Sequence, residues 1–447
     1  MGRNKRLFEF AEDFLLPAVL GLVIGLAILL LDYAYRLLNS ASLLIVNQSP
    51  PLRLLCALVA LFGGYLMVRL LAENKKYGCG TELVIESYHR RSGFLSLRDT
   101  VSKTLASAVT IGFGGSAGLE GPSLLLGGGI SSFITRRLKL SREDVKKMFL
   151  CGAAAGFSAI FRAPLTGILL ALEIPYKRDV ETEVFIPASI ASVTAYLVSA
   201  MTFGVEKIFP GPLFLVVAPP SLLLHAVVLG ILAALTALAF IKAFEGAKAV
   251  AEKLSRRFPM LYVVFLGGLI LGAIGLLHPE ALGLGYDFIH KITVAKLGEL
   301  SLTTLIALLI LKIITTSITL NFGGSGGLFI PALYVGGTLG LIYAQALNVE
   351  PPLFCVMLAM AAVLAAVNKT LLTGIALVAE TIGPSFIIST VVSAAISYFL
   401  TGDASFYKSQ ILDRGENKTS SQWQASCSLA VQESSTTPHR GRRRLEA

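Results

Sequence analysis

The chain has 447 residues, of which 54% are hydrophobic and only 15% are charged, and its mean hydropathy is +0.73. A soluble domain of this length needs more polar residues to cover its surface, so the composition indicates an integral, multi-pass membrane protein. The net charge of +10 comes largely from short basic stretches between apolar blocks and at both termini. That arrangement is typical of cytoplasmic loops and argues against a nucleic-acid partner.

The apolar blocks, taken in chain order, predict an all-α polytopic membrane protein with long and broken helices. Four blocks are long enough to cross the hydrocarbon core and carry no charge: Phe14–Leu31, Val184–Val205, Val216–Ile241 and Met260–Leu277. Two blocks of 15 residues predict only short or partial crossings: Leu54–Val68 and Phe386–Leu400. Forty-two glycines and 18 prolines are scattered among the blocks. Broken helices survive in lipid only where their free backbone groups face protein or water, so the mixture favours a transporter or channel.

The composition changes near the end of the chain. Residues 413–447 are polar and include the run Arg442–Arg444, so we expect a transmembrane domain over 1–412 followed by a disordered tail. The five cysteines show neither metal-binding nor disulfide spacing. We therefore expect no metal and no cofactor.

An internal repeat is the most informative feature of the sequence. Residues 113–128 read FGGSAGLEGPSLLLGG and residues 322–337 read FGGSGGLFIPALYVGG, with ten of sixteen positions identical at an offset of 209 residues. The same offset relates Lys103 to Lys312. A second matching stretch places Glu173 opposite Glu380 at an offset of 207. We therefore predict two repeated halves, at about 80–200 and 290–400, and expect them to be inverted as in many transporters.

Each copy of the repeat predicts a glycine loop that opens into a helix with proline in its first turn. A helix N-terminus presents unpaired N–H groups and about half a positive charge, and two such ends at one centre would form an anion site. Glycines in membrane helices often serve only close packing, which is the simpler reading. Glu120 favours an anion site over simple packing, because an ionisable group inside the membrane is energetically costly and is usually kept for a function. Its counterpart in the second copy is Phe329.

With these motifs the chain resembles the CLC family of chloride channels and proton–chloride exchangers. Residues 118–122 (GLEGP) resemble the family's G-(K/R)-E-G-P motif, in which the glutamate is the gate, and residues 327–331 (GLFIP) resemble G-x-F-x-P. Cys79 lies where the family has the serine of G-S-G-I-P, and Tyr407 matches the tyrosine that completes the central anion site. The resemblance implies two inverted halves with up to about 18 tilted helices, and a homodimer with one pore per subunit.

Carried over residue by residue, the resemblance implies a chloride path with two binding positions. The groups expected around a central chloride are Cys79, Leu328, Phe329 and Tyr407. The outer position would use amides around Leu119 and Gly121, and the ionised Glu120 carboxylate would compete with chloride for it. Protonation of Glu120 would then release that position to an anion.

Four positions depart from the family pattern. Cys79 replaces serine, and a thiol is the weaker donor, while Thr81-Glu82 replaces Ile-Pro. Leu119 replaces a cation. Ile174 stands where well-studied exchangers carry an inner glutamate that passes protons. The neighbouring Glu173 and its counterpart Glu380 read as structural, and we expect Lys103 and Lys312 to pair with these acids.

The sequence therefore predicts chloride transport gated by Glu120, as a passive or loosely coupled channel in a prokaryotic plasma membrane. A proton-coupled antiporter with another relay is the main alternative, since protons could reach Glu120 through water or a different acid. A fluoride exporter is a remote alternative, against which Tyr407 argues. An intramembrane serine protease is equally remote, because the only histidine after Ser325 is His439 in the polar tail. We do not expect an enzyme.

Overall fold

The computed structural model of the chain describes residues 11–205, 209, 220–294, 300–384 and 386–415. Most of the predicted tail, from residue 416 on, lies outside the described residues. The first half begins with a short π-helix, η1 (Ala11–Leu15), and continues through the following elements: α2 (Leu16–Gln48), α3 (Leu52–Leu71), β1 (Gly78–Cys79), α4 (Gly80–Arg90), α5 (Leu97–Gly112), α6 (Glu120–Arg137), α7 (Arg142–Phe161), α8 (Pro164–Glu173), η2 (Thr182–Val184) and α9 (Phe185–Phe203).

The second half repeats much of this order, after two long helices at its beginning. Its elements are α10 (Pro220–Arg257), α11 (Met260–Leu277), η3 (Pro279–Ala281), α12 (Tyr286–Thr293), α13 (Leu302–Asn321), β2 (Ser325–Gly326), α14 (Phe329–Leu347), α15 (Pro352–Asn368), α16 (Leu371–Thr381) and α17 (Ile387–Leu400). The two strands form one short parallel pair, with Gly78 opposite Ser325 and Cys79 opposite Gly326. The predicted helical membrane fold is confirmed.

Seven of the described helices are long and apolar enough to cross a membrane. One of them, α3, corrects a prediction: it has 20 residues because Arg53 and Arg69 lie inside the helix near its ends, where the apolar block Leu54–Val68 stops. The predicted short segment near residue 390 is indeed short, since α17 has 14 residues.

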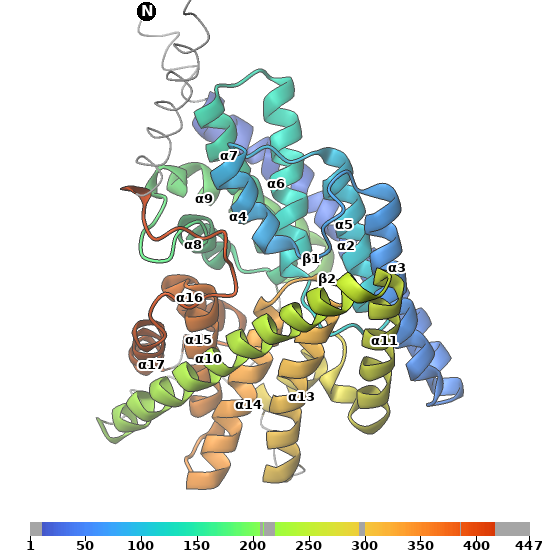
Figure 1. Cartoon of the computed structure of the whole chain (residues 1–447). Helices are drawn as coiled ribbons and strands as arrows, with labels where there is room; N and C mark the ends of the chain where they lie inside the picture. Colours follow the sequence, from blue (N-terminus) through green and yellow to red (C-terminus); the bar gives the residue numbers. More distant parts are fainter. Residues whose placement is uncertain (1–10, 206–208, 210–219, 295–299, 385, 416–447) are drawn as a thin grey trace, which may run out of the picture.

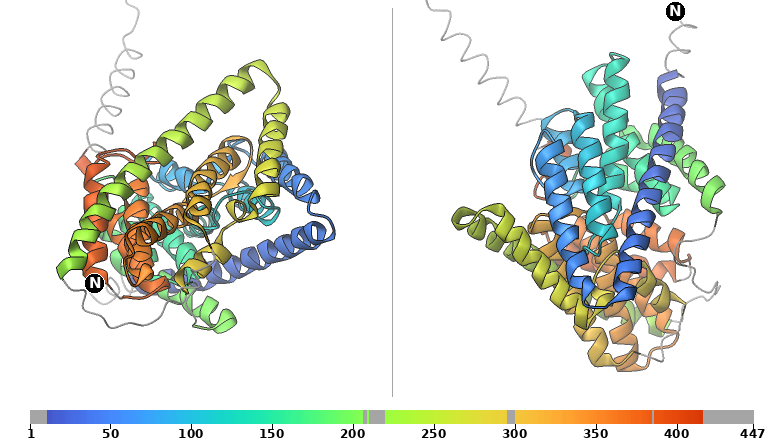
Figure 2. Two further views of the ribbon diagram at one scale, coloured as in Figure 1. Left: turned by 90° about the horizontal axis from the view of Figure 1, so that it is seen from below. Right: turned by 90° about the vertical axis from the view of Figure 1, so that its right-hand side faces the viewer.

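Lipid-facing and internal helices differ clearly in burial. The spanning windows of α2, α3, α9, α10 and α11 are 33–39% buried, whereas that of α14 is 72% buried. In Figure 2, α2 and α10 run along opposite edges of the molecule, with the orange α14 and α15 between them. Every residue of α15 from Leu353 to Asn368 is buried. Apolar side chains that are exposed on the outer helices are suited to contact lipid.

The two repeat copies meet through reciprocal contacts. The amide of Gly118 donates to the carbonyl of Gly327 (3.0 Å), and the amide of Gly327 donates to the carbonyl of Gly118 (2.8 Å). Ser116 N–H donates to Thr319 Oγ1 (3.0 Å), and Ser325 N–H donates to the repeat counterpart of that threonine, Thr110 (3.2 Å). Paired contacts of this kind are what a two-fold relation between two units produces. In Figure 1, α6 and α14 start near this centre and run in opposite directions.

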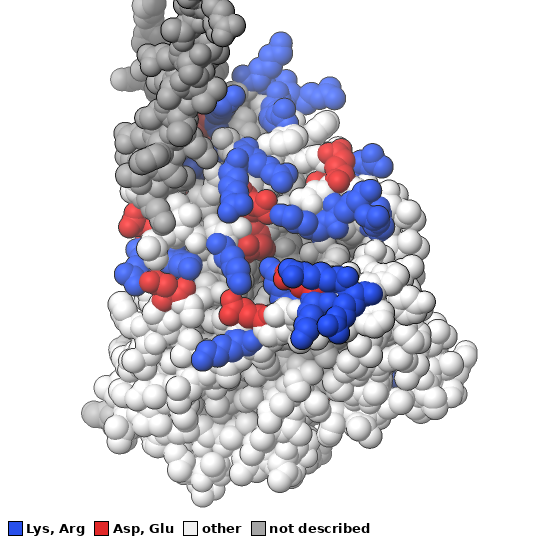
Figure 3. Space-filling model, viewed as in Figure 1, with Lys and Arg blue, Asp and Glu red and all other residues white. Residues whose placement is uncertain are grey.

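The basic side chains give the fold a polarity. On the face shown in Figure 3, Lys and Arg gather in the upper and middle parts, while the lower part carries no visible charge. The upper part includes the end of α6, with Arg136 and Arg137, and the beginning of α7. The positive-inside rule predicts that this side faces the cytoplasm.

Candidate functional site

The centre of the molecule is the place where α6 and α14 begin. Gly118 and Gly327, one from each copy of the repeat, lie against the Glu120 side chain, and a Cβ at either position would overlap its carboxylate. A Cβ at Gly121 would lie 2.8 Å from the carbonyl oxygen of Gly326. These glycines are therefore required by close approach, which brings two helix N-termini together around one side chain.

The Glu120 side chain is fully buried, and its carboxylate lies at the N-terminus of the opposite helix. Its Oε1 accepts a hydrogen bond from the Phe329 amide at 2.6 Å, while Oε2 has no hydrogen-bond partner among the described residues. The amide belongs to the first residue of α14, where the partial positive charge of the helix is concentrated. The carboxylate thus occupies a position that would suit a free anion.

Cys79 and Tyr407 lie near this carboxylate from two further segments of the chain. Cys79 precedes α4 and is fixed by the pairing of β1 with β2. The Tyr407 side chain is 1% exposed and lies in the neighbourhood of Cys79 and Glu120. Its hydroxyl has no hydrogen-bond partner within the described ranges. The structure therefore brings together Cys79, Glu120, Phe329 and Tyr407, while Leu119 and Leu328 occupy the N-cap positions of α6 and α14.

A cavity approaches the centre from one side, and we call it the inner cavity. It has a volume of about 470 Å³ and reaches Cys79 and Ser325. Five lysines and four glutamates line it, among them Lys103 and Glu82, and two of the lysines pair with glutamates. The lining is therefore strongly charged, with a small excess of positive charge that favours anions over cations.

A second cavity, the outer pocket, reaches Leu119 and Tyr286 and shares no lining residue with the inner cavity. Its volume is about 160 Å³. Cys79 lines the inner cavity, and Leu119, the residue before Glu120, lines the outer pocket. Each cavity thus reaches a residue near the Glu120 site, although Glu120 itself lines neither.

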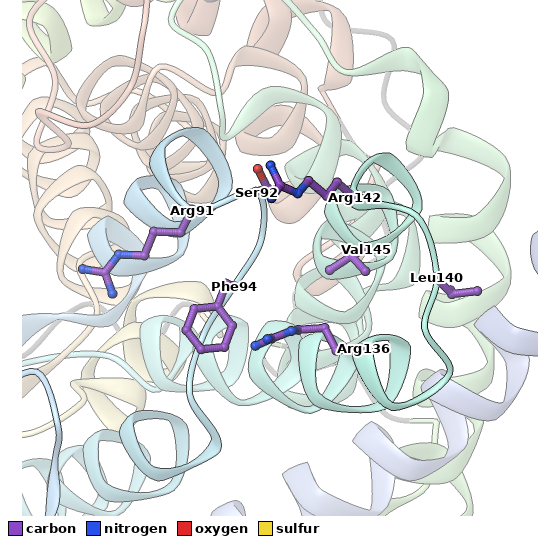
Figure 4. A pocket seen from close by; sticks show the side chains of 7 residues that line it. All are labelled: Arg91, Ser92, Phe94, Arg136, Leu140, Arg142 and Val145. Atoms are coloured by element: carbon purple, nitrogen blue, oxygen red, sulfur yellow. The ribbon is translucent and has the colours of Figure 1, made fainter. Parts of the chain in front are cut away.

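A third cavity, shown in Figure 4, belongs to a different part of the molecule. It has a volume of about 470 Å³ and is lined by three arginines, of which Arg136 lies 4.2 Å from the ring centroid of Phe94. Arg136 is 16 residues beyond Glu120 on α6, or about 24 Å along the helix axis. This basic pocket is therefore remote from the anion site.

The predicted pairing of two lysines with Glu173 and Glu380 is wrong for the described residues. Glu173 instead accepts hydrogen bonds from the amide (2.8 Å) and the hydroxyl (2.7 Å) of Thr373, at the start of α16. Glu380 accepts the equivalent bonds from Thr166, at the start of α8 (2.7 and 2.6 Å). Each acid thus caps a helix of the other half, and the orphan amides of a helix N-terminus satisfy a carboxylate without a cation.

The two lysines have separate environments. Lys103 lines the inner cavity. Lys312 is fully buried, and its ammonium donates to the Gly283 carbonyl at 2.9 Å and lies 4.9 Å from the ring centroid of Tyr334. A backbone carbonyl and an aromatic face therefore satisfy Lys312 instead of a carboxylate.

Ile174 is 1% exposed and follows the last residue of α8. Its apolar side chain cannot carry a proton. Glu82, noted in the sequence only as a departure from the family pattern, lies on the inner cavity. Its Oε1 accepts from Ser409 N–H (3.1 Å) and Oγ–H (2.8 Å), and its Oε2 has no hydrogen-bond partner among the described residues. Its position three residues after Cys79 was the signal available in the sequence.

Comparisons with known proteins agree with this arrangement. The chain matches the family described as voltage gated chloride channel over residues 58–402. It is 29% identical to an uncharacterized protein of Methanocaldococcus jannaschii (74% of this chain, 81% of the relative). It is 27% identical to a putative chloride channel protein ClcB-like of Ralstonia nicotianae (73% and 76%). It is 26% identical to a chloride/fluoride channel protein of Pseudomonas syringae pv. tomato (75% and 74%).

Two solved structures share the fold. A CLC-type fluoride/proton antiporter aligns with a TM-score of 0.76 and 23% identity, over 91% of this chain and 99% of its own. A slow cyanobacterial Cl⁻/H⁺ antiporter aligns with a TM-score of 0.76 and 22% identity, over 87% and 94%. Since the family match extends over most of the chain, this integral, multi-pass membrane protein belongs to the voltage gated chloride channel family.

Proposed function

We propose that the protein carries chloride across the membrane between the inner cavity and the outer pocket, with Glu120 as the gate. The observation that carries the proposal is the 2.6 Å hydrogen bond from the Phe329 amide to the Glu120 carboxylate. A carboxylate and a chloride ion compete for such a helix N-terminus, because both are anions that accept hydrogen bonds from its amides. The gate is closed while the carboxylate holds this position.

Protonation opens the gate in this proposal. A neutral carboxyl group interacts more weakly with the helix N-terminus, so the side chain can leave and chloride can enter. Chloride then passes Tyr407 and Cys79, whose hydroxyl and thiol donate to it. Helix amides and neutral donors bind the ion without a full opposing charge, which leaves it free to move on.

We propose passive or loosely coupled chloride flow, because Ile174 offers no proton carrier at the position where exchangers of the family use an inner glutamate. The test is chloride efflux from proteoliposomes with simultaneous recording of the external pH. We expect chloride efflux that accelerates at acid pH, and loss of this pH dependence in Glu120→Gln. A Glu120→Gln protein with the full pH dependence of the wild type would rule out the gate.

A coupled chloride/proton antiporter is the second candidate, and the position of Glu82 favours it. This carboxylate lies on the inner cavity and has an oxygen free of hydrogen bonds among the described residues. It could receive protons from the cytoplasm in place of the missing acid. If a chloride gradient drives protons uphill and Glu82→Gln stops the proton flux but not the chloride flux, the antiporter is correct. Without uphill proton movement in the wild type, the passive mode stands.

Fluoride export remains a remote alternative, supported by two relatives whose names include fluoride. Tyr407 favours chloride, because the resemblance places it at the central chloride site. A serine protease has little support, since the Ser325 hydroxyl has the Ser107 hydroxyl and the Gly78 carbonyl as hydrogen-bond partners. Competition of fluoride against radioactive chloride in the efflux assay decides between the two anions.

We further propose a homodimer in a prokaryotic plasma membrane, with one pore per subunit and no cofactor. The resemblance to the family supports the dimer, and the archaeal and bacterial relatives support the location. Chemical cross-linking in native membranes tests the assembly, and a monomer under all conditions would contradict it.

A further inference from the structure

The outer pocket is formed where α2, the end of α7 and the start of α12 converge beside Leu119. Its volume of about 160 Å³ sets the size of what it can hold. A water molecule occupies about 30 Å³ in the liquid, so the pocket has room for about five waters, or one small anion with part of its hydration shell. A nucleotide is too large for it.

The pocket carries one uncompensated positive charge. Arg36 donates its Nε–H to the Asp32 carboxylate at 2.7 Å, and the charges of this pair cancel. Arg162 also lines the pocket, and its guanidinium has no hydrogen bond or ion pair among the described residues. A half-buried guanidinium with five donors is suited to bind an anion.

The backbone at Arg162 indicates that the arginine is there for a reason other than packing. Arg162 ends α7 in the left-handed conformation (φ 51°), which glycine and asparagine adopt more easily. Its repeat counterpart is Lys369, which ends α15 with φ 57°. Lys369 is 2% exposed, and its ammonium donates to the Tyr398 carbonyl (2.8 Å) and the Thr401 hydroxyl (2.7 Å). Lys369 in the second half thus stabilises the fold through hydrogen bonds, whereas the Arg162 guanidinium in the first half makes no such bonds among the described residues.

Tyr286 provides a second donor in the pocket. Its hydroxyl is buried and has no hydrogen-bond partner among the described residues, and it shares the pocket lining with Arg162. A buried hydroxyl without a partner is unfavourable, and an anion in the pocket would supply the acceptor that it lacks.

We propose that the outer pocket is an additional binding site for a small inorganic anion, held by the Arg162 guanidinium and the Tyr286 hydroxyl directly outside the Glu120 carboxylate. Identifying that anion as the transported one rests on the proposed function. Leu119 stands where the family pattern has a cation, and Arg162 supplies a positive charge to the same opening from another helix. The site concentrates anions beside the gate, and it favours displacement of the carboxylate.

Bromide is the probe for direct binding, because its anomalous scattering locates it in crystals of the full chain. We expect an anomalous peak between Arg162 and Tyr286 in the wild type, and no such peak in Arg162→Gln. Glutamine accepts the same backbone conformation as arginine, so the fold is kept. Arg142→Gln is the matched control, since Arg142 lies at the opposite end of α7. A peak that persists in Arg162→Gln, or is absent from the wild type, would overturn the site.

Transport kinetics provide the functional test. In Arg162→Gln we expect the chloride concentration for half-maximal flux to rise about tenfold, which corresponds to the loss of a charged hydrogen-bond donor. Arg162→Lys should restore most of the affinity, Tyr286→Phe should raise the concentration about threefold, and Arg142→Gln should change nothing. An unchanged half-maximal concentration in Arg162→Gln refutes the role in transport. If the wild type carries no chloride, the proposed function fails, while the bromide peak still decides the site.

Discussion

Replacing Glu120 by glutamine tests whether the side chain competes with chloride for the same helix end. The carboxylate accepts a hydrogen bond from the Phe329 amide at 2.6 Å, and both belong to the fully buried centre. A hydrogen bond to a charged group contributes about 1.5–3 kcal/mol, against about 0.5–1.5 kcal/mol for a neutral one. Removing the charge therefore weakens the competitor by about 1–1.5 kcal/mol. That difference corresponds to about tenfold tighter apparent binding of chloride.

Isothermal titration calorimetry of purified protein in chloride-free buffer measures this change directly. The wild type should bind chloride more tightly as the pH falls, because protons remove the competing charge, whereas Glu120→Gln should bind tightly at every pH. The matched control is Glu280→Gln, which removes an exposed carboxylate outside the site. Equal chloride affinity in Glu120→Gln and the wild type at neutral pH would show that the carboxylate and chloride do not compete.

The other predictions concern the neighbours of this centre and the caps between the halves. Tyr407→Phe removes a buried hydroxyl that has no hydrogen-bond partner among the described residues. The chloride affinity measured by calorimetry should fall about three- to tenfold. An unchanged affinity would exclude Tyr407 from the site. Cys79→Ser supplies a stronger donor, and chloride should bind several-fold more tightly; weaker binding would contradict a donor role. Glu173→Gln weakens the cap on α16, and the thermal unfolding midpoint in detergent should drop by several degrees, with a loss of about 1–3 kcal/mol. A midpoint equal to the wild type would show that the cap is dispensable.

The sequence predicts the membrane fold and the two helix ends well, because both depend on residues that are close together along the chain. Apolar blocks give the spans, and the repeated glycine–proline motif gives two helix N-termini whose reciprocal contacts through Gly118 and Gly327 the structure then displays. The length of α3 was missed, since Arg53 and Arg69 break the apolar run but not the helix. Charges near helix ends can reach the interface, so they do not end a membrane helix.

Contacts between distant helices are harder to predict from the sequence. Charge balance suggested that Glu173 and Glu380 pair with lysines, but a helix N-terminus offers amides that satisfy a carboxylate equally well. Only the three-dimensional structure shows that Glu173 and Glu380 each lie at the N-terminus of a helix from the other half of the chain. Arg162 and Tyr286 were missed for the same reason. They come from α7 and α12, and nothing in their spacing along the chain indicates that both line one pocket.

The function arises where the two halves of the chain differ. Two-fold related helix ends alone would give a symmetric anion site, equally open to both sides of the membrane. Glu120 faces a helix end whose own residue at that position is Phe329, so only one copy supplies a gate. Arg162 leaves its guanidinium free beside the outer pocket, whereas Lys369 is bound to carbonyl and hydroxyl oxygens. In both cases the charged side chain suited to act on an anion belongs to the first half of the chain. The gate and an anion-attracting cation therefore both come from the first half of the chain, and Arg162→Gln should weaken the gate's response to external chloride without moving the gate.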